Sequence, residues 1–151
     1  MAMTMSGEIL LPADRETVWA KLNDPEVLKA CIPGCQSLEK NGDAGFVATV
    51  KIKVGPVGAT FKGSVELTDL DPPNSYRIVG QGEGGVAGFA KGGAQVALRD
   101  PEEGDGCVLS YQVEANVGGK IAQLGARLID GVAKKTADQF FENFATIVKA
   151  Q

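Results

Sequence analysis

Apolar residues recur every three or four positions from residue 119 to residue 150, in a run without proline. If each residue advances about 100° around a helix axis, the apolar residues fall on one side and most charged residues on the other. The spacing therefore predicts one long amphipathic helix, about 45 Å in length at about 1.5 Å per residue. Its predicted apolar stripe is Ile121, Leu124, Leu128, Val132, Thr136, Phe140, Phe144 and Ile147.

Most of the chain before this helix alternates between apolar and polar residues, which is the period of a β-strand with one buried face. Such alternation predicts strands at residues 4–11, 46–54, 59–68, 90–99 and 107–117, with further strands from Cys35 and through Tyr76. The inward positions include Phe46, Ala48, Val50, Ile52, Val54, Ala59, Phe61, Gly63, Val65 and Leu67. Regular alternation indicates an antiparallel sheet with one covered face.

Two short helices are expected between the first strand and the rest of the sheet. Asp14 is a plausible N-cap for the first, and Asp24 followed by Pro25 is the usual order at a helix start. The fold class is therefore α+β: a curved antiparallel sheet of about seven strands wrapped around a long C-terminal helix. Residues 1–151 form a single domain in this interpretation, with residues 1–3 as a cloning remnant.

The composition excludes several classes of function. The net charge is −4 without a basic cluster, which argues against nucleic acid as a partner. No histidine is present, so the usual catalytic triads and the commonest metal ligand are missing. Cys31, Cys35 and Cys107 are too few for a zinc site and are interpreted as free thiols in a reducing cytoplasm. No signal peptide or membrane-spanning run is expected.

Seven inward positions of the predicted sheet carry small residues, which either let the helix approach closely or leave a cavity: Ala48, Ala59, Gly63, Ala90, Gly92, Ala94 and Ala115. A cavity with such walls suits a lipophilic ligand that one or two hydroxyl groups orient. Gly125, inside the predicted stripe, has the same two interpretations: close packing or ligand space. The expected ligand-binding residues are Phe61, Tyr76, Ala94, Tyr111, Ile121, Leu124, Gly125 and Leu128.

The glycine-rich segment from Gly80 to Gly93 is expected to be a mobile loop at the rim of this cavity, although an ordinary wide turn is equally compatible. Its first residues match the letters of a dinucleotide-binding motif, but a strand rather than a helix is predicted next. No cofactor is therefore predicted. The expected rim consists of Pro33, Gly84, Val86, Phe89 and Gly118.

Several stretches resemble the carbon monoxide dehydrogenase G-subunit family, which belongs to the START-like superfamily. They are residues 118–135, residues 138–144, Trp19 with Asn23-Asp24-Pro25 and Leu28, Cys31-Ile32-Pro33-Gly34, and Gly82-Glu83-Gly84-Gly85. The resemblance covers nearly the whole chain. It implies the helix-grip fold of the birch pollen allergen, in agreement with the order of elements predicted above.

The resemblance also implies a function. It is that of a non-enzymatic accessory subunit of a molybdenum hydroxylase of the carbon monoxide dehydrogenase type, which handles a quinone or lipid. Its partners would be the hydroxylase subunits, with peripheral contact to the inner face of the cell membrane and a homodimer as open possibilities. Two alternatives remain: a START-like enzyme of the cyclase or hydratase kind, and a protein-interaction subunit with no cavity.

Overall fold

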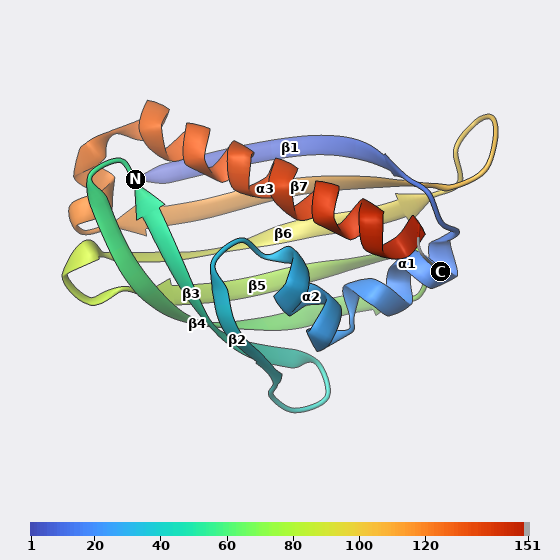
Figure 1. The fold of residues 1–151 in the computed structure, drawn as a ribbon, viewed down its shortest axis with the longest axis horizontal. Helices are drawn as coiled ribbons and strands as arrows, with labels where there is room; N and C mark the ends of the chain where they lie inside the picture. Colours follow the sequence, from blue (N-terminus) through green and yellow to red (C-terminus); the bar gives the residue numbers. More distant parts are fainter. Residues whose placement is uncertain (150–151) are drawn as a thin grey trace.

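The computed structural model describes residues 1–149, which form one antiparallel sheet, three α-helices and two short 3₁₀ helices (Figure 1). The strands are β1 (Ala2–Leu11), β2 (Cys35–Lys40), β3 (Gly45–Val54), β4 (Val57–Asp71), β5 (Ser75–Glu83), β6 (Phe89–Arg99) and β7 (Cys107–Gly118). The helices are α1 (Arg15–Leu22), α2 (Pro25–Cys31), η1 (Gly85–Ala87), η2 (Lys120–Leu124) and α3 (Ala126–Lys149). This is the predicted fold class.

The seven strands are ordered β1-β7-β6-β5-β4-β3-β2, and every neighbouring pair is antiparallel. From β2 to β7 the chain forms a simple meander, and β1 adds to β7 at the far edge. The sheet curves around α3, with α1 and α2 at one end and η1 and η2 at the other (Figure 1). A curved sheet of this kind has one concave face, and α3 lies across it.

The two short helices begin where capping residues predict them. The Asp14 carboxylate accepts a hydrogen bond from the Thr17 backbone N–H at 2.8 Å, and the Asp24 carboxylate accepts one from the Glu26 N–H at 2.9 Å. Pro25 occupies the first turn of α2, where its missing N–H costs nothing. The prediction of two short helices is confirmed.

The long C-terminal helix is shorter than predicted. Residues 120–124 form the separate 3₁₀ helix η2, and α3 begins at Ala126 instead of Gly119. Gly125 separates them with φ +97°, a backbone conformation that residues other than glycine rarely adopt. The predicted helix also included Ala150, which lies outside the described residues.

This break changes the phase of the buried stripe. The buried residues of α3 are Ile129, Phe144 and Val148, whereas Leu128 is 37% exposed. Thr136, also predicted to be in the stripe, is exposed as well. The predicted stripe is confirmed at Ile121 and Phe144. It was wrong by one position at Leu128 and Ile147, next to which Ile129 and Val148 are buried, because it treated η2 and α3 as one continuous helix.

The glycine-rich segment is mostly strand, so the prediction of a long mobile loop was wrong. β5 continues to Glu83 and β6 starts at Phe89, so only five residues connect them. Gly80 pairs with Gly92 and Gly82 with Ala90 in the sheet. These glycines permit close approach of backbones, because a side chain at Gly92 would collide with the backbone of β7 at Glu114 and Ala115.

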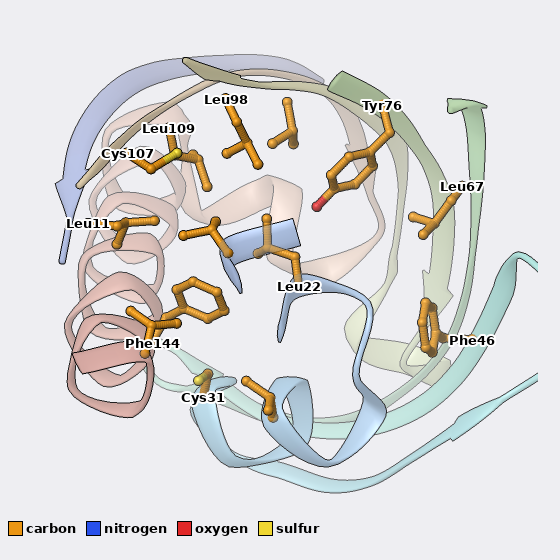
Figure 2. Packing of buried hydrophobic residues seen from close by; sticks show 14 of the residues in the cluster. Leu11, Leu22, Cys31, Phe46, Leu67, Tyr76, Leu98, Cys107, Leu109 and Phe144 are labelled. Atoms are coloured by element: carbon orange, nitrogen blue, oxygen red, sulfur yellow. The ribbon is translucent and has the colours of Figure 1, made fainter. Parts of the chain in front are cut away.

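The apolar interior consists of two clusters of buried residues. The larger one lies toward α1 and α2 and includes Leu11, Leu22, Tyr76, Leu109 and Phe144 (Figure 2). The smaller one lies toward η1 and η2 and consists of Val54, Ala87, Val117, Ile121 and Ile129. In both clusters the sheet contributes the inward positions that alternation predicts.

One side-chain hydrogen bond ties α3 to the end of α2. The Asn143 side-chain amide donates to the Cys31 backbone oxygen at 3.1 Å. It satisfies a carbonyl near the C-terminus of α2 that has no partner within the helix. The C-terminal half of α3 is therefore fixed in place by this bond as well as by the larger cluster.

Candidate ligand-binding cleft

An apolar cleft opens between the concave face of β3 and β4, the turn after α2 and the middle of α3. Its volume is about 460 Å³. Apolar side chains and glycines form most of its wall: Ile32, Pro33, Gly34, Leu38, Phe46, Ala48, Val50, Ile52, Phe61, Gly63, Val65, Gly82 and Val132. Ligand sites in proteins commonly have volumes of roughly 300–1,000 Å³, so the cleft is large enough for a small organic molecule.

Small residues at inward positions create this space. Ala48 pairs with Gly63, and Gly63 pairs with Gly82, so three adjacent strands carry almost no side chain at one level of the sheet. A side chain at Gly63 would come within 2.9 Å of the Gln81 backbone oxygen, so that glycine is needed for the strands to approach. At Gly82 the same construction meets only ordinary contacts at 3.8 Å or more, so this position is simply empty.

Few polar groups reach the cleft, and they lie near its edge. Lys51, Lys53, Ser64, Gln81 and Thr136 border it. The Thr136 hydroxyl donates to the Val132 backbone oxygen at 2.8 Å and is therefore already paired. Val65 occupies an inward position, lines the cleft and is 37% exposed. Such walls bind a ligand through apolar area rather than through charge.

The structure brings together only part of the predicted ligand-binding set. Of the eight residues, Phe61 lines the cleft. Ile121 and Leu124 pack in the smaller cluster, and Gly125 forms the break before α3. Leu128 lies beside Gly55 at the β3–β4 turn.

The three other predicted ligand-binding residues face the concave side of the sheet without lining the cleft. Ala94 pairs with Ile78 on β5 and Val113 on β7. Tyr111 stacks on Phe141 of α3, with ring centroids 5.3 Å apart, and its side chain covers Gly7 of β1. Tyr76 belongs to the larger cluster.

The predicted site omitted eight apolar side chains of the cleft: Ile32, Leu38, Phe46, Ala48, Val50, Ile52, Val65 and Val132. The alternation along residues 46–54 already pointed four of them inward. The missing information was where α3 crosses the sheet, because that crossing decides which inward residues are covered and which border open space.

The predicted rim is also divided. Pro33 lines the cleft, and Gly84 lies against the ring of Phe61. Val86, which is 92% exposed, and Phe89, whose ring covers Gly118, lie around η1 at the end of the fold away from α1 and α2. The turn at Ile32–Gly34 therefore borders the cleft, and from the glycine-rich segment Gln81 and Gly82 of β5 line it whereas η1 does not.

A larger hollow of about 1090 Å³ lies on the opposite face of the sheet. Its lining includes Glu66, Arg77, Lys91 and Glu114, which are charged residues on outward positions of β4 to β7. Charged and glycine-lined surface of this kind is well hydrated, so the smaller apolar cleft is the better candidate for a lipophilic ligand.

The described part of the chain offers few side chains for acid–base or metal chemistry. Among residues 1–149, no charged side chain is buried, and no group of three or more carboxylates and cysteines is placed to hold a metal ion. Cys31 and Cys107 are buried free thiols, and Cys35 is half-buried. Burial raises the pKa of all three thiols, so they are protonated at neutral pH.

The chain is similar in sequence to one protein family and in structure to several solved proteins. Residues 7–149 match the model of the CoxG family, described as the G subunit of carbon monoxide dehydrogenase. A crystal structure of a conserved protein from Geobacillus kaustophilus is 36% identical with a TM-score of 0.90, covering 97% of this chain and 95% of that one. A comparison with curated protein sequences gives no significant match.

Two enzymes share the fold at low identity. The ZhuI aromatase/cyclase from Streptomyces sp. R1128 has a TM-score of 0.70 at 10% identity, covering 99% of this chain and 94% of that one. Norcoclaurine synthase from Thalictrum flavum has a TM-score of 0.65 at 16% identity, covering 98% and 94%. At this identity the likeness concerns the fold alone. Within residues 1–149, none of the helices has the length and apolar character needed to cross a bilayer.

Proposed function

The chain belongs to the CoxG family of carbon monoxide dehydrogenase proteins, and from this premise we propose that it is an accessory subunit of a molybdenum hydroxylase of the carbon monoxide dehydrogenase type. In this proposal it binds a lipophilic molecule, a quinone or a lipid, in the cleft beneath α3. The apolar cleft of about 460 Å³ is the observation that carries the proposal. A protein-interaction subunit with a filled interior would have no such opening.

The proposed role is binding without catalysis. An enzyme of the cyclase or hydratase kind needs an acid or base positioned against its substrate. The apolar residues of the cleft provide no such group, and its lysines are at the edge. The chemistry of carbon monoxide oxidation would then belong to other subunits, and this chain would deliver or hold the lipophilic molecule.

Coupling to a cytoplasmic membrane surface fits the exposed apolar residues around η1. Val86 is 92% exposed and lies on η1, between Gly84 and Gly88, and Phe89, the first residue of β6, is 43% exposed. Side chains of this kind can enter the interfacial layer of a bilayer without a spanning helix. In this proposal the protein touches the membrane briefly through these residues.

The test is to purify the protein from its own host under gentle conditions and to weigh it by native mass spectrometry. The expected result is an added mass of one lipophilic molecule, which organic extraction releases as a quinone or lipid, together with co-purification of hydroxylase subunits. A protein of bare chain mass that neither takes up quinones or lipids in vitro nor retains any hydroxylase subunit would refute the proposal.

A further inference from the structure

Several elements meet at the end of the fold opposite α1 and α2, and they form one surface there. The buried residues of the smaller cluster come one each from β3, η1, β7, η2 and α3: Val54, Ala87, Val117, Ile121 and Ile129. η1 and η2 also lie directly against each other, because a Cβ atom at Gly119 would collide with the Gly88 Cα atom. We call this the η end and define it as residues 51–62, 83–91 and 118–130 (Figure 1).

The η end is basic, although the whole chain has a net charge of −4. Its basic residues are all exposed: Lys51, Lys53, Lys62, Lys91, Lys120 and Arg127. Its acidic residues are Glu83, which is opposite Lys62 in the sheet, and Asp130. The ion pairs found within residues 1–149 involve none of these basic residues. The basic residues are scattered along the sequence, so only the fold brings them together.

The other end of the fold is acidic. The end of β4 and the β6–β7 connection contribute Asp69, Asp71, Asp100, Glu102, Glu103 and Asp105. The two short helices with their caps and Lys149 are balanced in charge, so this end is negative overall. β4 connects the two ends, and its 15 residues span roughly 45 Å. The Debye length at physiological salt is about 8 Å, so a charged surface next to one end scarcely acts on the other.

Apolar side chains project from the η end among the basic ones. Val86 on η1 is 92% exposed, Phe89 is 43% exposed, and Leu128 in the first turns of α3 is 37% exposed. Apolar side chains of this kind enter the interfacial layer of a bilayer, and lysines and arginines around them bind anionic headgroups. Each basic residue close to such a surface strengthens binding roughly fivefold.

We propose that the η end is a docking surface for a bilayer that contains anionic lipids, an inference that rests on the membrane contact of the proposed function. A protein with net negative charge is repelled by an anionic bilayer unless its charges are separated. Here the basic end faces the headgroups, and the acidic end lies several Debye lengths away. The contact therefore has one orientation, in which η1 and η2 touch the bilayer and α1 and α2 face away from it.

The test measures sedimentation of the untagged full-length protein with two kinds of vesicle in about 0.1 M salt. One kind is phosphatidylcholine alone, and the other contains about 30% phosphatidylglycerol, which is anionic. The wild type is compared with the double variant Lys120→Gln/Arg127→Gln. The matched control is Lys40→Gln/Lys149→Gln, which removes the same charge from exposed positions outside the η end. Thermal unfolding checks that both variants are folded.

We expect the wild type to bind the anionic vesicles at least about 30-fold more tightly than the neutral ones, and about 1 M salt to remove this difference. Lys120→Gln/Arg127→Gln should weaken binding to the anionic vesicles by about 30-fold, and the control by less than about 2-fold. Equal binding of the wild type to both kinds of vesicle, or equal losses in both variants, would overturn the electrostatic docking and leave an apolar membrane contact in place. If the wild type bound neither kind, the membrane contact of the proposed function would fail with this inference, and the η end would instead fit an acidic surface of a partner protein.

Discussion

Replacement of Gly82 by leucine tests whether the cleft is the ligand site. Gly82 occupies an inward position of β5, and its backbone conformation is not left-handed. A Cβ atom placed there meets nothing closer than the Lys62 backbone oxygen at 3.8 Å. The new side chain therefore points into the open cleft without forcing the strands apart.

The expected loss of ligand affinity follows from the volume that the leucine side chain occupies in the cleft. The ligand loses burial equivalent to one leucine side chain, which is worth about 1.5–3 kcal/mol. Binding should weaken by about 10- to 140-fold. The fold itself should be unchanged or gain about 0.5–1 kcal/mol, because glycine in a strand interior is destabilising. Weaker binding together with unchanged or higher stability would therefore show loss of the site and not loss of the fold.

The assay combines duroquinone binding by calorimetry with thermal unfolding of the ligand-free protein. Gly58→Leu is the matched control, because Gly58 lies on β4 with no neighbour within 4 Å of a Cβ atom and does not line the cleft. Unchanged binding in a folded Gly82→Leu protein would refute the cleft as the site. A loss of stability of about 1–3 kcal/mol would show instead that the space is already filled, because overpacking has that cost.

Three further predictions concern the fold. Gly125→Ala should cost about 1–3 kcal/mol of unfolding free energy because its φ is +97°. Gly131→Ala, in the exposed interior of α3, should instead raise the unfolding free energy by about 0.4–1 kcal/mol. Urea unfolding compares the two variants, and equal effects would contradict the break at Gly125. Phe144→Ala should cost about 3–5 kcal/mol in the same assay, because the side chain is fully buried, and a loss below about 1 kcal/mol would contradict its place in the core. The hydrogen bond from the Thr17 N–H lowers the pKa of Asp14 below its ordinary 3.8, so the stabilisation by this cap is present above pH 3.8 and is lost as the pH falls through the lowered value. The unfolding free energy of Asp14→Ala should therefore depend less on pH between about 2 and 4 than that of the wild type. Equal pH dependence of the variant and the wild type would exclude the cap as the cause.

The sequence predicted the fold well because its signals are local. Alternation defines the inward face of β3 from Phe46 to Val54, and capping residues define the starts of α1 and α2. The break at Gly125 could not be predicted in the same way, because η2 and α3 carry apolar residues at similar spacing on either side of it. Only the left-handed backbone of the glycine separates them.

The site was predicted less well because it depends on distant contacts. Small residues such as Ala48 and Gly63 indicated a cavity, but their number does not tell where α3 leaves the sheet uncovered. The glycines from Gly80 to Gly92 were interpreted as flexibility, whereas the structure uses them for close strand pairing.

The position of β1 at the sheet edge has a consequence for biosynthesis. β1 is made first, yet within residues 1–149 it pairs with β7 alone, and Leu11 pairs with Cys107, which is 96 residues later in the chain. At about 5–20 residues per second, the first strand waits roughly 5–20 s on the ribosome before its partner exists. During that time the unpaired edge of β1 and the apolar faces of the other strands are exposed to non-native association. The native fold can form only after β7 and α3 have left the ribosome.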